Sequence, residues 1–207
     1  MKLPIAWKAT ILVFIILLAD QILKIWVKTH MFYGDSISVF GNWFRINFVE
    51  NAGMAFGWEF GGKVGKMLLS IFRLLAIVAF IWYIRELIKQ KAPHGFIICV
   101  SLILAGAMGN MIDCAFYGIL FGESAANSLA TFLPDGGGYA SFLYGKVVDM
   151  LSFPIIDSTY PSWFPFKAGQ QLLFFKPIFN IADSAVTTGV FSIIFFHWGY
   201  LKRTSKN

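Results

Sequence analysis

Residues 95–116, "GFIICVSLILAGAMGNMIDCAF", decide the fold class of this chain. Almost all of them are apolar, and about 20 apolar residues are enough for an α-helix to cross the hydrocarbon core of a bilayer. Three more stretches have the same character, at residues 5–27, 67–88 and 178–200. The sequence therefore predicts a mainly α integral membrane protein with four transmembrane helices.

The composition agrees with this class. Hydrophobic residues make up 57% of the 207 residues and charged residues only 14%, with a mean hydropathy of +0.68. The formal net charge is +6, but Lys and Arg are dispersed and form no basic patch with interleaved aromatic residues. We therefore expect no nucleic-acid partner. The positive charge is expected to set topology and to contact anionic membrane lipid. Residues 1–207 are predicted to form one domain.

Positive charges near the helix ends orient the predicted helices, because cytoplasmic loops are enriched in Lys and Arg. Such residues precede the first helix, fill the short link between the second and third, and follow the fourth: Lys2, Lys8, Lys89, Lys91, Lys202, Arg203 and Lys206. Both termini are then cytoplasmic. Two long connections, at about residues 28–66 and 117–177, are left outside.

The two outer connections differ in pattern. "SISVFGNWFRINFVENAGMAFGWEF" in the first alternates apolar and polar residues around β-branched and aromatic positions. This alternation predicts a small extracytoplasmic β-sheet element at about residues 37–60. The second connection is rich in Gly, Pro and aromatic residues and is too apolar for a free linker. We expect it to lie along the membrane surface, with its aromatic residues at headgroup depth.

Ionisable residues at membrane depth are rare, and each is a candidate functional group. Five positions qualify here: Asp20, Lys24, Asp113, Asp149 and Asp183. Asp20 and Lys24 are spaced i, i+4 on one helix face, which favours a structural ion pair. Asp113 ends the third helix, where a functional role and simple snorkelling to the interface are both open.

Asp183 is expected one to two turns inside the fourth helix, with Asn180 on the same face. Helix capping explains both residue types and, taken alone, is the stronger explanation. If Asp149 meets Asp183 at the outer face, repulsion and desolvation raise one of the two pKa values. The ionised carboxylate then activates water while the protonated one donates to a scissile carbonyl, which is the chemistry of an aspartic protease. Buried carboxylates fit a small ion- or proton-coupled transporter equally well.

No metal or cofactor site is expected. Cys99 and Cys114 lie in one apolar stretch without CxxC or Cys/His spacing, so neither a disulfide nor a zinc site is predicted.

Five short motifs occur in order over nearly the whole chain. They are "ADQILKIWV" with Asp20 and Lys24, "ENAGMAFG" with Asn51, Gly53, Ala55 and Phe56, "GAMGNMID" with Gly106, Gly109, Asn110 and Asp113, "VVDM" with Asp149, and "FNIADSAV" with Asn180, Ala182 and Asp183. Together they resemble the motifs of the lipoprotein signal peptidase (signal peptidase II) family, bacterial aspartic proteases with four membrane spans.

The resemblance implies a specific activity. The chain would remove signal peptides from diacylglyceryl-modified prolipoproteins at the outer face of the bacterial inner membrane, cleaving N-terminal to the lipidated cysteine. Asp149 and Asp183 would form the catalytic dyad, with Asn51 and Asn110 supplying hydrogen bonds. Phe56 would help to line the side where acyl chains and the substrate backbone dock. We expect a monomer that needs neither metal nor cofactor.

The chain departs from the family pattern in two places. The family usually has Arg directly after the aspartate of the third motif, where this chain has Cys114, and Lys24 or Lys146 is a candidate substitute. The dipeptide Tyr-Gly also occurs twice, at 117–118 and 144–145, which leaves 27 additional residues before "VVDM". This insertion, at about residues 118–145, is predicted to lie outside and to decorate the rim of the site.

Overall fold

The computed structural model describes residues 3–41, 43–52, 62–154, 156–159, 161–163, 165–166, 169–174 and 176–204. Gly53 and Phe56, both predicted site residues, lie outside these ranges, as does the end of the predicted β element.

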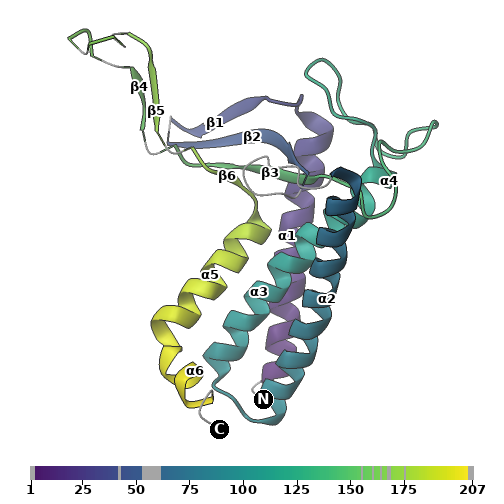
Figure 1. Ribbon diagram of the computed structural model, residues 1–207, viewed down its shortest axis with the longest axis vertical. Coiled ribbons are helices and arrows are strands. Elements are labelled where there is room, and N and C mark those ends of the chain that lie inside the picture. The colour runs from purple at the N-terminus through teal and green to yellow at the C-terminus, as the bar shows by residue number, and fades with distance from the viewer. Residues whose placement is uncertain are drawn as a thin grey trace.

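The helices form a bundle around α3 (His94–Ile112), which contacts α1 (Ile5–His30), α2 (Gly62–Lys89) and α5 (Ile181–Phe196), as Figure 1 shows. A π-helical turn, η2 (Asp113–Tyr117), continues α3 into the short helix α4 (Gly118–Leu120). Large apolar side chains on α1, α2 and α5 point outward, among them Phe14, Phe72, Leu75, Trp82 and Phe195. Such a surface suits contact with lipid acyl chains.

Three helices of the described chain are long and apolar enough to cross a membrane: α1, α2 and α3 together with its continuation to Leu120. The predicted fourth helix at 178–200 is wrong in its bounds. Strand β6 (Ile178–Phe179) precedes α5, which has 16 residues, and the helix breaks at His197 before α6 (Trp198–Thr204). An apolar run in the sequence does not distinguish strand residues from helix residues. A fourth crossing therefore stays a prediction.

Helices α3 and α5 approach closely because small residues line their contact. A Cβ atom added to Gly106 would lie 2.2 Å from the carbonyl oxygen of Ala182, and one added to Gly109 would lie 2.9 Å from the Ala182 Cβ. Gly189 of α5 meets the Cys99 carbonyl in the same way. This packing brings the start of α5 against the end of α3.

A four-stranded antiparallel sheet covers one end of the bundle, in the order β1 (Ser36–Phe40), β2 (Phe44–Asn51), β3 (Val147–Ser152) and β6. The predicted β element of the first connection is present as β1 and β2. Its partner β3 is the motif "VVDM" with its neighbours, for which the sequence predicted no strand. β3 is almost entirely buried. It forms by pairing with strands distant in the sequence, which a local sequence pattern does not reveal.

The second connection holds more structure than a surface-lying segment. Strands β4 (Ile156–Thr159) and β5 (Gln171–Phe174) pair as a separate antiparallel hairpin, which projects from the sheet in Figure 1. The predicted insertion at about residues 118–145 starts with the short helix α4 at 118–120. It folds back so that the backbone N–H of Gly145 donates to the Cys114 carbonyl over 2.8 Å.

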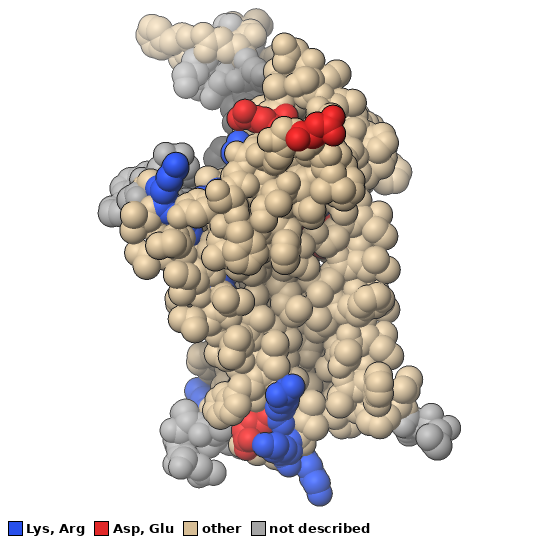
Figure 2. Space-filling view, turned by 90° about the vertical axis from the view of Figure 1, so that its right-hand side faces the viewer, with Lys and Arg blue, Asp and Glu red and all other residues tan. Residues whose placement is uncertain are grey.

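Both chain ends lie at the end of the bundle opposite the sheet (Figure 1). Figure 2 shows charged side chains mainly toward the two ends of one face, with a mostly uncharged band between them. This distribution matches a protein whose middle lies in hydrocarbon.

Candidate active site

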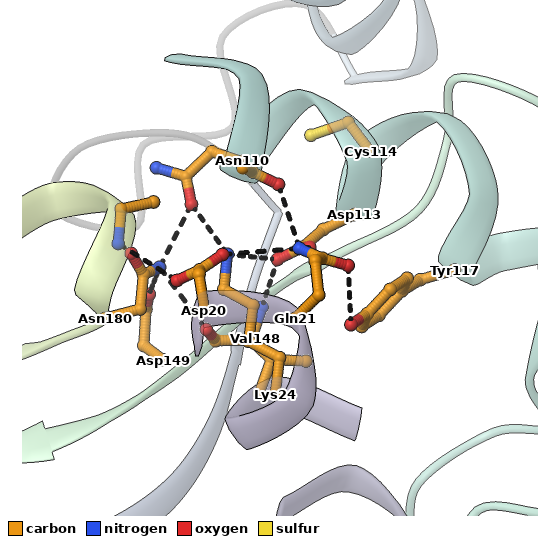
Figure 3. A network of polar contacts seen from close by, with 12 residues as sticks. Asp20, Gln21, Lys24, Asn110, Asp113, Cys114, Tyr117, Val148, Asp149 and Asn180 are labelled. Carbon is orange, nitrogen blue, oxygen red and sulfur yellow. Dashed lines mark hydrogen bonds and ion pairs between the residues drawn. The ribbon is translucent and has the colours of Figure 1, made fainter. Parts of the chain in front are cut away.

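A buried polar network joins α1 to α3 at the sheet end of the bundle (Figure 3). Lys24 Nζ lies 2.8 Å from Asp20 Oδ2 and 2.7 Å from Asp113 Oδ2, and all three side chains are fully buried. The expected ion pair between Asp20 and Lys24 is therefore present, and it includes a second carboxylate. The alternative that the Asp113 side chain snorkels to the interface is wrong, because it is buried in the bundle and paired with Lys24.

Asp113 also anchors the strand that carries Asp149. One oxygen accepts a hydrogen bond from Gln21 Nε2 over 2.9 Å, and the other accepts from the backbone N–H of Val148 over 3.2 Å. Tyr117 in turn donates its hydroxyl to Gln21 Oε1 over 3.2 Å (Figure 3). Sequence reasoning missed Gln21. Its one signal was an amide beside Asp20 in an otherwise apolar stretch.

Asp20 performs a second task at the start of α5. Its Oδ1 accepts a hydrogen bond from the backbone N–H of Ala182 over 2.9 Å. The first N–H groups of a helix have no partner within the helix, so a buried carboxylate satisfies one of them here. Gly109 leaves the room for this contact, since a Cβ atom there would lie 2.9 Å from Asp20 Oδ2.

Asp149 and Asp183 meet through asparagine side chains. Asp149, on β3 and 6% exposed, accepts from Asn180 Nδ2 over 2.7 Å and from Asn51 Nδ2 over 3.3 Å. Asp183 Oδ1 accepts from Asn110 Nδ2 over 2.7 Å. Asn180 Oδ1 accepts from the backbone N–H of Asp183 over 2.8 Å. Asn180 therefore contacts both aspartates.

Asp183 lies in the first turn of α5, so its predicted place one to two turns inside the helix is wrong. Asn180 is the N-cap, and its backbone N–H donates a weak hydrogen bond of 3.4 Å to Asp183 Oδ2, which completes a capping box. Capping and a site role are therefore compatible, because the cap uses Oδ2 and leaves Oδ1 to Asn110.

The electrostatics of Asp149 are unusual for a carboxyl group. Burial, followed by the charge of Asp183, raises the pKa of Asp149 to about 7, against the lowering effects of Asn51, Lys24 and Asn180. A large fraction of Asp149 therefore carries a proton at neutral pH. A strongly shifted pKa of this kind is common at catalytic sites.

The cation beside Cys114 comes from an unexpected helix. Arg73 of α2 donates from Nη1 to Cys114 Sγ over 3.1 Å. The two predicted substitutes have other partners: Lys24 pairs with aspartates, and Lys146 Nζ lies 3.3 Å from Glu50 Oε2. In the sequence, this cation was indicated by Arg73 itself, an arginine inside the apolar run at residues 67–88. Among the described residues, no group of three or more His, Cys, Asp or Glu side chains is arranged to hold a metal ion.

Two solved structures share this architecture, and both are described as bacterial membrane enzymes. One, at 2.3 Å resolution, has a TM-score of 0.56 and 25% identity over 97% of this chain and 91% of its own. The other, at 1.9 Å, has a TM-score of 0.58 and 26% identity over 90% of both chains. The fold and the buried carboxylates thus define a bacterial membrane enzyme.

Sequence comparison narrows this class to one family. The lipoprotein signal peptidase of Porphyromonas gingivalis is 43% identical over 194 residues, which cover 93% of this chain and 84% of the relative. That of Amoebophilus asiaticus is 36% identical over 191 residues, covering 91% and 76%. The family model of signal peptidase (SPase) II matches residues 12–198. The chain belongs to the signal peptidase II family.

Proposed function

We propose that this protein is an aspartic endopeptidase that removes signal peptides from diacylglyceryl-modified prolipoproteins, cleaving N-terminal to the lipidated cysteine. Family membership and the lipoprotein signal peptidases among its relatives support the substrate class. One observation carries the assignment of the dyad: Asp149 and Asp183 share Asn180 as a hydrogen-bonding neighbour, and the pKa of Asp149 is raised to about 7.

In the proposed mechanism the two carboxyl groups take different roles. Asp149 is the carboxyl group whose pKa is raised, so it starts protonated and Asp183 removes a proton from water. The water oxygen bonds to the scissile carbonyl carbon while protonated Asp149 donates its proton to the carbonyl oxygen. The tetrahedral intermediate then breaks its C–N bond. Asp183 returns its proton to the leaving nitrogen, and Asp149 takes back the hydroxyl proton as the new carboxyl group forms. The two groups titrate as one coupled pair.

The remaining polar residues support the dyad and take no part in bond making. Asn51 and Asn110 each donate to one aspartate. Lys24 stays paired with Asp20 and Asp113, and these two carboxylates fix the start of α5 and the strand β3. Sites held by neighbouring hydrogen bonds in this way keep the reacting groups in the productive geometry.

The proposed orientation puts the dyad near the outer face of the inner membrane. The dyad lies at the sheet end of the bundle, opposite both termini (Figure 1), and the positive-inside rule makes the termini cytoplasmic. A scissile bond beside a lipid-anchored cysteine lies at that depth, where acyl chains of the substrate and of membrane lipid are close. The protein is proposed to act as a monomer, since one chain supplies all the residues of the dyad and its support.

A cleavage assay tests the proposal. Purified protein in detergent is incubated with a lipidated prolipoprotein, and loss of the signal peptide is followed by gel shift for the wild type, Asp149→Asn and Asp183→Asn. Asp135→Asn is the matched control, because Asp135 is exposed on the insertion. We expect cleavage by the wild type and the control only, and no cleavage of a precursor whose cysteine carries no lipid. An inactive wild type, or full activity of either dyad variant, would contradict the proposal.

A further inference from the structure

A second charge cluster, with a buried centre and a partly exposed edge, lies beside the proposed site and has no part in the reaction. It consists of Lys28, Glu50, Lys146 and Ser124. We propose that this cluster is a positioning element, through which the insertion holds Asn51 against Asp149. The inference rests on the proposed function of the dyad.

Glu50 is the centre of the cluster, with a side chain only 2% exposed. Its Oε1 accepts hydrogen bonds from Lys28 Nζ and from the Ser124 hydroxyl, the latter over 2.8 Å. Its Oε2 lies 3.3 Å from Lys146 Nζ. Lys28 is fully buried and also donates to Ser124 Oγ over 2.8 Å. A charge removed from such a cluster leaves its partners buried without compensation.

The insertion supplies much of this environment. The ammonium group of Lys28 lies 5.5 Å from the ring centre of Phe121 and 4.9 Å from that of Tyr139, and Lys146 Nζ lies 5.3 Å from the Tyr139 ring. The Tyr139 hydroxyl accepts from the Lys146 backbone N–H over 2.6 Å. Ring faces attract cations at these distances. Phe121, Ser124 and Tyr139 all belong to the insertion, which therefore does more than decorate the rim.

The cluster is connected to the dyad through two paired strands. Glu50 pairs with Val148 and Asn51 with Val147 in the ladder between β2 and β3. The anchored carboxylate of Glu50 and the amide of Asn51, which donates to Asp149, therefore belong to adjacent residues. Lys146 immediately precedes β3, so the cluster fixes the end of one strand and the start of the other.

Loss of this anchor is expected to affect the chemistry through Asn51. The Asn51 hydrogen bond lowers the pKa of Asp149, while burial and Asp183 raise it and Lys24 lowers it. When Glu50 is neutral, the end of β2 is free to shift, and the bond from Asn51 weakens. The apparent pKa of the dyad then rises. Misplacement of a positioning group by about 1 Å can reduce turnover by about a hundredfold.

The experiment measures kcat, KM and the pH–rate profile on the lipidated precursor. Glu50→Gln is compared with Glu123→Gln, which neutralises an exposed carboxylate of the insertion. We expect Glu50→Gln to reduce kcat by about ten- to a hundredfold, with little change in KM, and to move the profile to higher pH. Glu123→Gln should match the wild type. Ser124→Ala, which removes one hydroxyl and is mild enough to preserve the fold, should move the profile in the same direction by less.

A double-mutant cycle distinguishes positioning from general support of the fold. Asn51→Ala should give the same upward shift as Glu50→Gln, and the double variant should shift no further. Fully additive effects, or a Glu50→Gln protein with a lowered melting temperature but a wild-type profile, would overturn the inference. The proposed function fails separately, since it fails only if the wild type does not cleave or a dyad variant does.

A second inference rests on a groove at the opposite end of the bundle, between α1, α2 and α3. Its volume is about 490 Å³, and its walls are apolar side chains such as Ala6, Leu17 and Met108, with Arg85 among them. We propose that this groove binds one acyl chain of an anionic phospholipid of the leaflet on the side of the termini, with the phosphate at Arg85. This inference does not depend on the protease assignment.

The length, the apolar lining and the charge of the groove suit an acyl chain with an anionic headgroup. It follows α1 from Ala6 to Leu17, which is about 16 Å at 1.5 Å per residue and close to half of the roughly 30 Å hydrocarbon core. This length and the apolar lining suit a single acyl chain. Arg85 is exposed and lies one turn before the end of α2, at headgroup depth for that leaflet.

Native mass spectrometry of the detergent-purified protein tests the groove. Phosphatidylglycerol and a diacylglycerol with the same chains are compared as probes. We expect one phosphatidylglycerol to be retained by the wild type and by Lys89→Gln, an exposed charge beyond the groove lining. Ala6→Phe, which fills the groove, should lose the lipid, and Arg85→Gln should retain several-fold less. Equal retention by Ala6→Phe, or a preference for diacylglycerol, would refute the inference.

Discussion

Asp149→Asn is expected to stabilise the protein at neutral and alkaline pH while it removes activity. Burial and the charge of Asp183 raise the pKa of Asp149 from 3.8 to about 7. The folded protein therefore binds this proton more tightly than the unfolded chain does. The stability that the carboxyl contributes is complete below about pH 4 and is lost as the pH rises through 7. A difference of about three pKa units corresponds to about 4 kcal/mol.

The measurement is thermal unfolding in detergent from pH 4 to pH 9, followed by tryptophan fluorescence. The free energy of unfolding of the wild type should fall across the window from pH 4 to pH 7. The free energy of unfolding of Asp149→Asn should fall less, since no carboxyl remains at this position to be deprotonated. The difference between the two decreases should reach up to about 4 kcal/mol. Asp135→Asn, an exposed control, should keep the slope of the wild type.

Parallel curves for the wild type and Asp149→Asn would refute this reasoning. They would mean that Asp149 titrates alike in the folded and unfolded chain, so that neither burial nor Asp183 affects its charge. The opposite result, an inactive variant that is more stable than the wild type at pH 8, is the trade-off expected when a site holds a carboxyl in an unfavourable environment.

Two further substitutions test how the helices around the site fit together. Gly106→Ala should lower the free energy of unfolding by about 1–3 kcal/mol, because its Cβ would lie 2.2 Å from the Ala182 carbonyl oxygen. Gly199→Ala is the control, because the space around its Cβ is open. Equal thermal stability of the two variants would contradict the expectation. Cys114→Arg should lower the melting temperature, because a second guanidinium would face that of Arg73 in a buried position. The double variant with Arg73→Leu should recover part of this loss, and a fully additive loss would show that charge repulsion is not the cause.

Hydropathy predicted the helices where a single physical requirement dominates. A bilayer demands about 20 apolar residues in succession, and the bounds of α1, α2 and α3 follow from that demand within a few residues. The prediction failed at 178–200 because two apolar strand residues precede α5 and a break at His197 follows it. It also missed β3, whose residues are buried on both faces and lack the alternation that marks a half-buried strand.

The site residues that stand out in the sequence are charged residues inside apolar helices, and these were predicted. Charged residues that are buried only by tertiary contacts were not predicted. Carboxylates such as Asp20 and Asp113 are conspicuous in apolar helices, so they were found. Lys28 and Glu50 look like ordinary charges, one at the edge of a span and one in the predicted β element, yet both are almost fully buried. Their importance depends on contacts with Ser124 of the insertion, which follows them by 96 and 74 residues in the chain, and no local pattern records such contacts.

One face of α1 relates the elements of the site to one another. Asp20, Lys24 and Lys28 are spaced by four residues, so their side chains lie in a row, and all three are fully buried. Each is bound to a different element: Asp20 to the start of α5, Lys24 to the π-helical turn η2 that continues α3, and Lys28 to β2. Because an unpaired buried charge is strongly unfavourable, each element has to meet its own charge. The row therefore fixes where the helix capped by Asn180 meets the sheet that carries Asp149, two segments with no local relation in the sequence.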